Sequence, residues 1–214
     1  MSHVAAVQLE ILDLKALKAT AERLGFEFVE NKKNFKWYGR WLNDWRDNTR
    51  AAALQGFDPK TFGTCEHVIR IPGGDVHQYE IGVVKARSGN GYELIYDAFG
   101  AYGAKLEQMG GQGMVKFKQP YGIEVAKRLL IKKGYRVNEI VKDGRIRLQA
   151  VNARGSLIAQ EVDEAGNVSI ETKGFTGSDC IKETMELERA LGRKTGDMKT
   201  AEYYKVQSKL EVKR

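Results

Sequence analysis

The first forty residues show two patterns of apolar positions, one typical of a helix and one typical of strands. After Asp13, which can cap a helix, apolar residues fall at three- and four-residue spacing until Gly25 ends the pattern. The apolar positions are Leu14, Leu17, Ala21 and Leu24. FEFVE and FKWYG then carry aromatic and β-branched residues that favour strands, with the polar turn NKKN between them. This stretch predicts a helix followed by a β-hairpin.

The same order of elements recurs later in the chain. A helical pattern ends at Gly134, and YRVNEIV and RIRLQAV then flank the turn residues Asp143 and Gly144. The apolar side of this helix consists of Ile123, Ala126, Leu130 and Ile131. Because a helix and a hairpin each need a second surface to bury their apolar sides, we expect two related helix-hairpin units in one domain. Coincidence is the alternative, since an aromatic residue often follows a helix-ending glycine.

The segments between and after these units complete the predicted architecture. CEHVIRIP, VHQYEIGVVKA and GYELIYDAF are strand-like and should complete an antiparallel sheet. LIAQEVD and NVSIETKG predict a second small hairpin, followed by a helix. The fold class is therefore α+β. We expect a main domain over residues 1–151, a small hairpin-helix unit over 157–192 and a basic C-terminal tail over 193–214.

Composition limits the protein class. The chain is 42% hydrophobic and 29% charged, as in ordinary globular proteins. No apolar run reaches the length of a membrane helix, and MSHVAAVQLEIL does not resemble a secretion signal. With only Cys65 and Cys180 and three histidines, no disulfide framework is expected. We therefore expect a cytoplasmic protein with reduced thiols and no membrane partner.

Lysine and arginine concentrate between residues 116 and 149, in a chain whose formal net charge is +7. Clustered cations displace counterions from phosphates, so this stretch indicates nucleic acid as a possible partner. The candidate basic patch is Lys127, Lys132, Lys133, Arg136, Arg145 and Arg147. The alternative is a well-solvated helix and hairpin whose charge serves solubility.

Tryptophans alternate with cations between Trp37 and Arg50. The candidate binding surface is Trp37, Arg40, Trp41, Trp45 and Arg46. Such side chains can stack on the bases of single-stranded nucleic acid or form the centre of a protein interface. They can equally fix a long loop onto the sheet.

Cys180 lies near the expected start of the last helix, where exposed amides favour a thiolate. This position makes it the candidate catalytic residue. However, the segment after residue 157 contains no histidine to act as its base. Helical spacing also places the thiol on an apolar stripe, which favours core packing. The stripe is formed by Cys180, Thr184, Leu187 and Leu191.

Cys65, His67 and His77 are residue types that bind zinc, and they come from neighbouring strand-like runs. Their spacing matches no known metal motif. The alternative is structural: Cys65 packs and His77 forms a hydrogen bond across the sheet. No cofactor is predicted. Asp97, after an apolar strand, can act as a catalytic carboxylate or cap the next helix.

Several runs in residues 1–151 together resemble an uncharacterised family. These runs are SHV, FKWYGRW, GTCEHVIRIPG, YEIGVV, GYELIYD and GYRVNEIVKDGRIRL. They are similar to the Ycf-thirty-five-type family of cyanobacteria, plastids and bacteriophages. The tail from VDEAGNVSIETKG to AEYY resembles a second family, number twenty-nine ninety-seven of the domains of unknown function. The resemblance implies a fusion of the two and brings no assigned activity or catalytic residue.

No catalytic triad or carboxylate pair stands at a recognisable spacing. We therefore predict a non-catalytic binding or adaptor protein that acts on a protein partner, compatible with a bacteriophage accessory factor in the host cytoplasm. Two alternatives stay open. One is nucleic-acid binding by the basic stretch and the Trp37 to Arg50 segment, and the other is thiol chemistry at Cys180. The partner's identity and the oligomeric state are not predicted.

Overall fold

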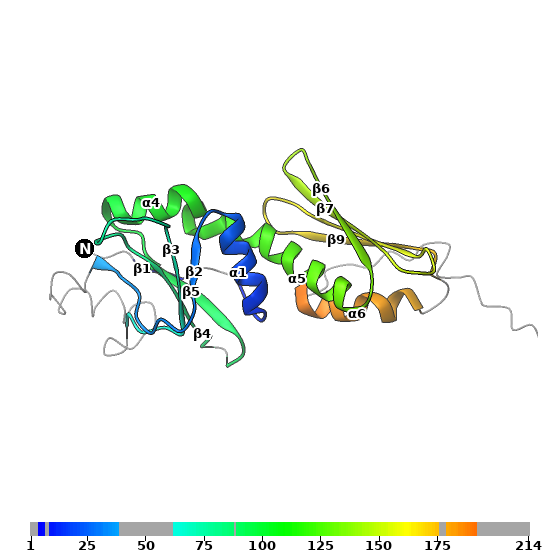
Figure 1. Ribbon diagram of the computed structural model, residues 1–214, viewed down its shortest axis with the longest axis horizontal. Coiled ribbons are helices and arrows are strands. Elements are labelled where there is room, and N and C mark those ends of the chain that lie inside the picture. Colours follow the sequence, from blue (N-terminus) through cyan, green and yellow to red (C-terminus); the bar gives the residue numbers. More distant parts are fainter. Residues whose placement is uncertain (1–3, 7–8, 39–61, 88, 176–178, 192–214) are drawn as a thin grey trace, which may run out of the picture. The chain divides into compact units, whose positions relative to one another are not determined.

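The computed structural model describes residues 4–6, 9–38, 62–87, 89–175 and 179–191 (Figure 1). The chain forms two compact units, Met1–Tyr121 and Gly122–Arg214. Within the residues described, each unit contains helices and one antiparallel sheet, which confirms the predicted α+β class.

The described part of the first unit holds a five-stranded antiparallel sheet with the strand order β1-β5-β4-β3-β2. Its strands are β1 Val4–Ala6, β2 Glu27–Val29, β3 His67–Arg70, β4 Ile81–Lys85 and β5 Tyr92–Asp97. The unit also holds the helices α1 Leu14–Arg23 and α4 Gly100–Gly110, and the short 3₁₀ helix η1 Gln112–Phe117. Asp13 caps α1 as predicted, because its carboxylate accepts the N–H groups of Lys15 and Ala16.

The hairpin predicted from FEFVE and FKWYG is wrong. β2 pairs with β3, with Glu27 opposite Arg70, and the second run is not its partner. Phe35 and Trp37 instead cover one face of the sheet, where they form an apolar cluster with Phe62. The ring of Phe35 lies against Gly82 of β4, in the space that the side chain of any other residue at position 82 would occupy. Burial of the two rings therefore outweighs the strand preference of the run.

A partly buried ion pair holds the segment that contains Phe35 and Trp37 in place. The carboxylate of Glu80 is only 3% exposed, and it accepts hydrogen bonds from the Lys32 ammonium at 2.6 and 2.7 Å. It also accepts the backbone N–H of Lys36 at 3.0 Å. One carboxylate therefore fixes two points of the segment next to β4.

The described part of the second unit holds a four-stranded antiparallel sheet in the order β6-β7-β8-β9. Its strands are β6 Arg136–Lys142, β7 Arg145–Val151, β8 Leu157–Val162 and β9 Val168–Lys173. Its helices are α6 Asp179–Leu191 and the larger part of α5 Lys118–Lys132, and both lie on the same side of the sheet (Figure 1). The predicted hairpins β6–β7 and β8–β9 are both confirmed.

One core joins all the elements of the second unit. Ile146, Leu148 and Ala150 alternate along the covered face of β7, and they pack with the apolar residues of both helices. The helix residues are Ile123, Ala126, Leu130 and Leu187. The opposite face of the sheet is not covered by a described helix.

The chain therefore divides differently from the expected domains. Residues 122–151 do not belong to a main domain over 1–151, because β7 pairs with β8 along its length, from Ile146 opposite Val162 to Val151 opposite Leu157. The expected pair of related helix-hairpin units in one domain is also wrong, since the first lacks its hairpin and the second belongs to the other unit. The predicted basic tail, 193–214, lies outside the described residues.

Gln160 of β8 is fully buried on the covered face of the sheet, opposite Leu148 and Ile170. Neither its amide nitrogen nor its amide oxygen has a hydrogen-bond partner in the described residues. A buried unsatisfied amide costs about 1–3 kcal/mol. We therefore expect Gln160→Leu to raise the free energy of unfolding of the second unit by about 1 kcal/mol or more, measured by urea denaturation. A destabilised variant would contradict this account of the amide.

Candidate functional site

The structure describes the side-chain environment of Cys65 but not that of Cys180. Cys65 is 7% exposed, and its thiol donates a hydrogen bond to the Lys32 carbonyl oxygen at 3.1 Å. Burial raises the pKa of this thiol to about 12, so it stays protonated and unreactive at neutral pH. Cys180 lies in the first turn of α6, and its side chain lies outside the described part. The stripe that follows it is confirmed, because Thr184 and Leu187 are buried and Leu191 packs on the same core.

The reactivity of Cys65 gives a direct test of its environment. At pH 8.5 a pKa of about 12 leaves about a thousand times less thiolate than an unperturbed cysteine has. We expect iodoacetamide to modify Cys65 far more slowly in native than in urea-unfolded protein, measured by mass spectrometry of the Cys65 peptide. Equal rates would show that the thiol is accessible. Because the pKa is raised on folding, this thiol stabilises the fold below pH 9, and the contribution is lost as the pH rises toward 12.

The predicted metal ligands are not brought together. His67 accepts the N–H of Asn31 at its Nδ1 atom, and its ring lies 5.4 Å from that of Phe28. His77 lies in the loop before β4, where its N–H donates to Asp75. In the described ranges, no group of three or more histidine, cysteine, aspartate or glutamate side chains could hold a metal ion.

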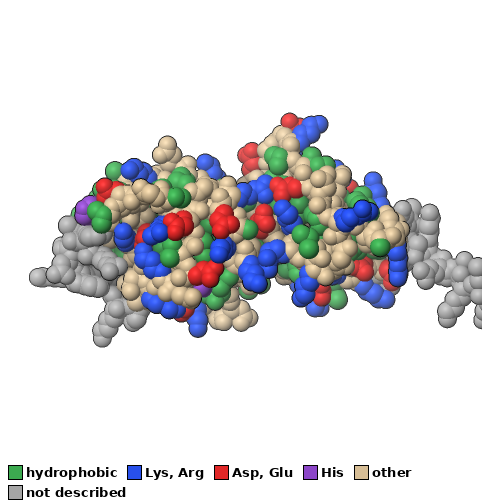
Figure 2. Space-filling view, in the orientation of Figure 1, with side chains coloured by type: hydrophobic (Ala, Val, Ile, Leu, Met, Phe, Trp, Pro, Cys, Tyr) green, Lys and Arg blue, Asp and Glu red, His purple; other side chains and the backbone are tan. Residues whose placement is uncertain are grey.

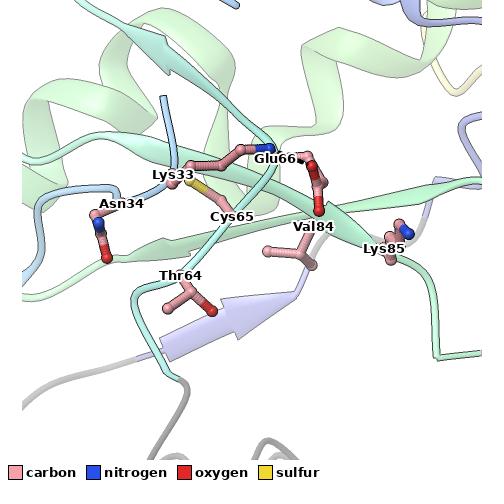
Figure 3. Close-up of a pocket in the computed structure, with 7 residues that line it drawn as sticks. All are labelled: Lys33, Asn34, Thr64, Cys65, Glu66, Val84 and Lys85. Atoms are coloured by element: carbon pink, nitrogen blue, oxygen red, sulfur yellow. Dashed lines mark hydrogen bonds and ion pairs between the residues drawn. The ribbon is translucent and has the colours of Figure 1, made fainter. Parts of the chain in front are cut away.

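A shallow pocket of about 450 Å³ lies beside Cys65 in the first unit (Figure 3). Its described lining is Lys33, Asn34, Thr64, Cys65, Glu66, Val84 and Lys85. The Lys33 ammonium and the Glu66 carboxylate form an ion pair at 2.5 Å. This lining contains no imidazole, and its single carboxylate is the one paired with Lys33.

Asp97 is fully buried and acts as a structural anchor. Its carboxylate accepts the N–H of Phe99 at 2.9 Å, immediately before α4, and the N–H of Tyr38 at 3.2 Å. The predicted capping role is wrong, because the N-cap of α4 is Phe99 and this helix has no side-chain cap bond.

The first residue of the candidate surface between Trp37 and Arg50 is buried. Trp37 is only 4% exposed, and its ring meets Phe62 edge-on with the centroids 4.6 Å apart. It therefore belongs to the core and not to a binding surface. The other four candidates, Arg40, Trp41, Trp45 and Arg46, lie outside the described residues.

The six residues of the predicted basic patch do not form one patch. Lys127 and Lys132 belong to α5, on the covered side of the sheet, and Lys133 directly follows this helix, whereas the arginines alternate along the uncovered face. These arginines are Arg136, Arg145 and Arg147. Figure 2 shows that Lys and Arg side chains are interspersed with Asp and Glu on the side in view.

Ion pairs neutralise most of these cations. On the helical side, Lys127 pairs with Glu139 at 3.6 Å, and Lys133 lies 3.5–3.6 Å from two glutamates of α6. On the uncovered face, Arg145 pairs with Glu161 at 2.9 Å and Arg147 with Glu171 at 3.5 Å. In the described part of the second unit, glutamates therefore offset most of the charge of this basic stretch.

β6 forms an open edge of the sheet, because β7 is its only neighbouring strand in the described part of the chain. Asp143 and Gly144 have φ values of 50° and 71°, as in the type I′ turn of a two-residue hairpin. Lys142 and Arg145 thus form the hydrogen-bonded pair that closes the turn, and such pairs alternate along the ladder. The residues whose backbone N–H and C=O groups point away from β7 are therefore Val137, Glu139 and Val141.

Apolar side chains lie along this open edge of the sheet. Val141 is 64% exposed, and Ile140 is also exposed on the other face of the strand. Lys127 of α5 reaches Glu139 of β6, and Ile131 lies four residues after Lys127 on the same face of the helix. Ile131 is 55% exposed. We call β6 together with Lys127 and Ile131 the β6 edge.

The other described sheet edges are less suited to pairing. β1 and β2 are three residues long, whereas β6 is seven. β9 has six residues, and its exposed side chains are Ser169, Glu171 and Lys173, with no large apolar residue among them. The β6 edge therefore combines the longest open strand with exposed apolar side chains.

Comparison with known proteins identifies one segment. Residues 158–204 match a family described as a protein of unknown function, DUF2997, and the match includes most of β8 and all of β9 and α6. No curated protein and no solved structure matches the chain. The resemblance of residues 1–151 to the Ycf-thirty-five-type family stays a prediction. None of the described helices is both long and apolar enough to cross a membrane.

Proposed function

We propose that this protein is a non-catalytic binding module that takes up an extended segment of a protein partner as an additional strand beside β6. The observation that carries the proposal is the β6 edge, which combines an open seven-residue strand bearing exposed Ile140 and Val141 with the exposed Ile131 of α5. Strand addition supplies main-chain hydrogen bonds for affinity, and alternate side chains supply specificity. Because residues 1–151 resemble the Ycf-thirty-five-type family, we also propose that the protein is a bacteriophage accessory factor in the host cytoplasm.

Charge disfavours a second copy of this chain as the partner. Antiparallel pairing of β6 with its twofold copy over the whole strand would place Arg136 opposite Lys142. It would also place Glu139 opposite the same residue of the copy. Like charges directly opposite each other destabilise a sheet, so a different chain suits the edge better.

Nucleic acid is the less supported partner, because four of the six predicted basic residues are in ion pairs and the six lie on two sides of the sheet. The uncovered face of the sheet also carries no aromatic side chain for base stacking. We therefore expect only weak, strongly salt-dependent binding of DNA or RNA.

The test is selection of random peptides of about ten residues, enough to span β6, on the immobilised full chain. The selected peptides are then titrated against Val141→Asp and Ile131→Asp. We expect each substitution to weaken binding about tenfold, since it places a charge beside the added strand. Ile181→Asp is the matched control, because Ile181 is similarly exposed on α6. Binding that survives Val141→Asp and Ile131→Asp but fails with Ile181→Asp would contradict the proposal.

A further inference from the structure

Building on the proposed function, we infer that the partner segment carries an acidic residue at each end of a seven-residue stretch, with apolar residues beside them. The acidic residues lie opposite Arg136 and Lys142, at the two ends of β6. Such a segment matches the β6 edge in both charge and apolar surface.

The cations at the two ends of β6 on the uncovered face determine where the partner segment carries its acidic residues. Arg136 and Lys142 occupy the outermost positions of the β6 row on this face, and neither forms an ion pair in the described residues. Lys142 also lies opposite Arg145, so two cations are adjacent at that end. Directly opposite side chains in neighbouring strands are about 5 Å apart. One carboxylate of an added strand can therefore pair with Arg136 and another with Lys142.

The covered face determines the apolar positions. Val141 and Val137 flank Glu139 on this face, and Ile131 of α5 extends the apolar surface. Apolar residues of the partner opposite Val137 and Val141 would bury this surface. Glu139 is already paired with Lys127, so a neutral or basic residue suits the central position, where a carboxylate would add repulsion.

These constraints give a sequence pattern for the partner. Read antiparallel to β6, from the position opposite Lys142 to the position opposite Arg136, it is acidic, apolar, apolar, neutral or basic, unrestricted, apolar, acidic. The third position lies opposite the exposed Ile140, and the unrestricted position lies opposite Asn138.

The test uses two synthetic peptides with the full chain. One contains Glu-Val-Val-Lys-Thr-Val-Glu, the other has lysine in place of both glutamates, and both carry the same Gly-Ser flanks. We expect the acidic peptide to bind about tenfold more tightly than the basic one, and the preference to invert with Arg136→Glu combined with Lys142→Glu. Lys173→Glu combined with Lys182→Glu makes the same change of charge on β9 and α6, and should leave the preference unchanged.

The inversion also shows that the doubly substituted chain is folded, because binding of the basic peptide is gained. Equal binding of the two peptides, or a preference that does not invert, would overturn the inferred chemistry. If library-selected peptides depend on Val141 and Ile131 but lack the acidic pattern, this inference fails while strand addition stands. If those selected peptides do not depend on Val141 or Ile131, the proposed function itself fails.

Discussion

Replacing Lys32 with methionine is expected to lower the free energy of unfolding of the first unit by about 3–5 kcal/mol. The substitution keeps the length of the side chain but removes the ammonium that pairs with Glu80. Glu80 is almost fully buried. Of the two donors to its carboxylate described above, the variant would keep the backbone N–H of Lys36. Urea unfolding followed by tryptophan fluorescence measures the effect, because all three tryptophans lie in the first unit.

Two further variants define the cause of this loss. Lys33→Met removes the same charge from the adjacent position, where the ion pair with Glu66 is exposed, and should cost less than about 1 kcal/mol. Adding Glu80→Gln to Lys32→Met should recover part of the loss, since the amide can still accept the Lys36 N–H without a buried charge. Equal effects of Lys32→Met and Lys33→Met would show that burial of the pair is unimportant.

Leu148→Ala is expected to lower the free energy of unfolding of the second unit by about 2–5 kcal/mol, because Leu148 is fully buried between the sheet and its two helices. Hydrogen exchange of the backbone amides measures the effect in each strand. We expect exchange to accelerate in β8 and β9 as well as in β6 and β7, since the four strands share one core.

Leu12→Ala is the matched control, because it deletes the same atoms from an exposed position and should change stability by less than about 0.5 kcal/mol. Faster exchange after Leu148→Ala that is confined to β6 and β7 would contradict a common core. That result would support the division into 1–151 and 157–192 that the sequence favours.

Local patterns predict the individual elements well, because they depend on residues close in sequence. The cap at Asp13, the turn at Asp143 and Gly144 and the apolar stripe along α6 are all confirmed in the described residues. The pairing of strands depends on distant residues and was predicted poorly. FKWYG has strand-like composition, but Phe35 and Trp37 are buried on the face of the sheet. Nothing near them in sequence indicates that Gly82 leaves room for Phe35.

The site shows the same limitation. Clustering in sequence suggested a basic patch, but alternation along the strands and the helix position separate its six members. Glutamates from other elements also pair with four of them. The run YRVNEIV contains the residues of the β6 edge, and its alternation predicts a strand. Only the order of the sheet shows that this strand has an open side. A strand at a sheet edge and one at its centre have similar local signals.

The most direct test of the central claim is hydrogen exchange at single-residue resolution by NMR, on the full chain with and without a library-selected peptide. The amides of Val137 and Val141 point away from β7, so they should exchange rapidly in the free protein and become protected when the peptide adds as a strand. The amides of β9, at the other edge of the sheet, serve as the internal reference. Saturating binding that leaves the exchange of the Val137 and Val141 amides unchanged would contradict strand addition at β6.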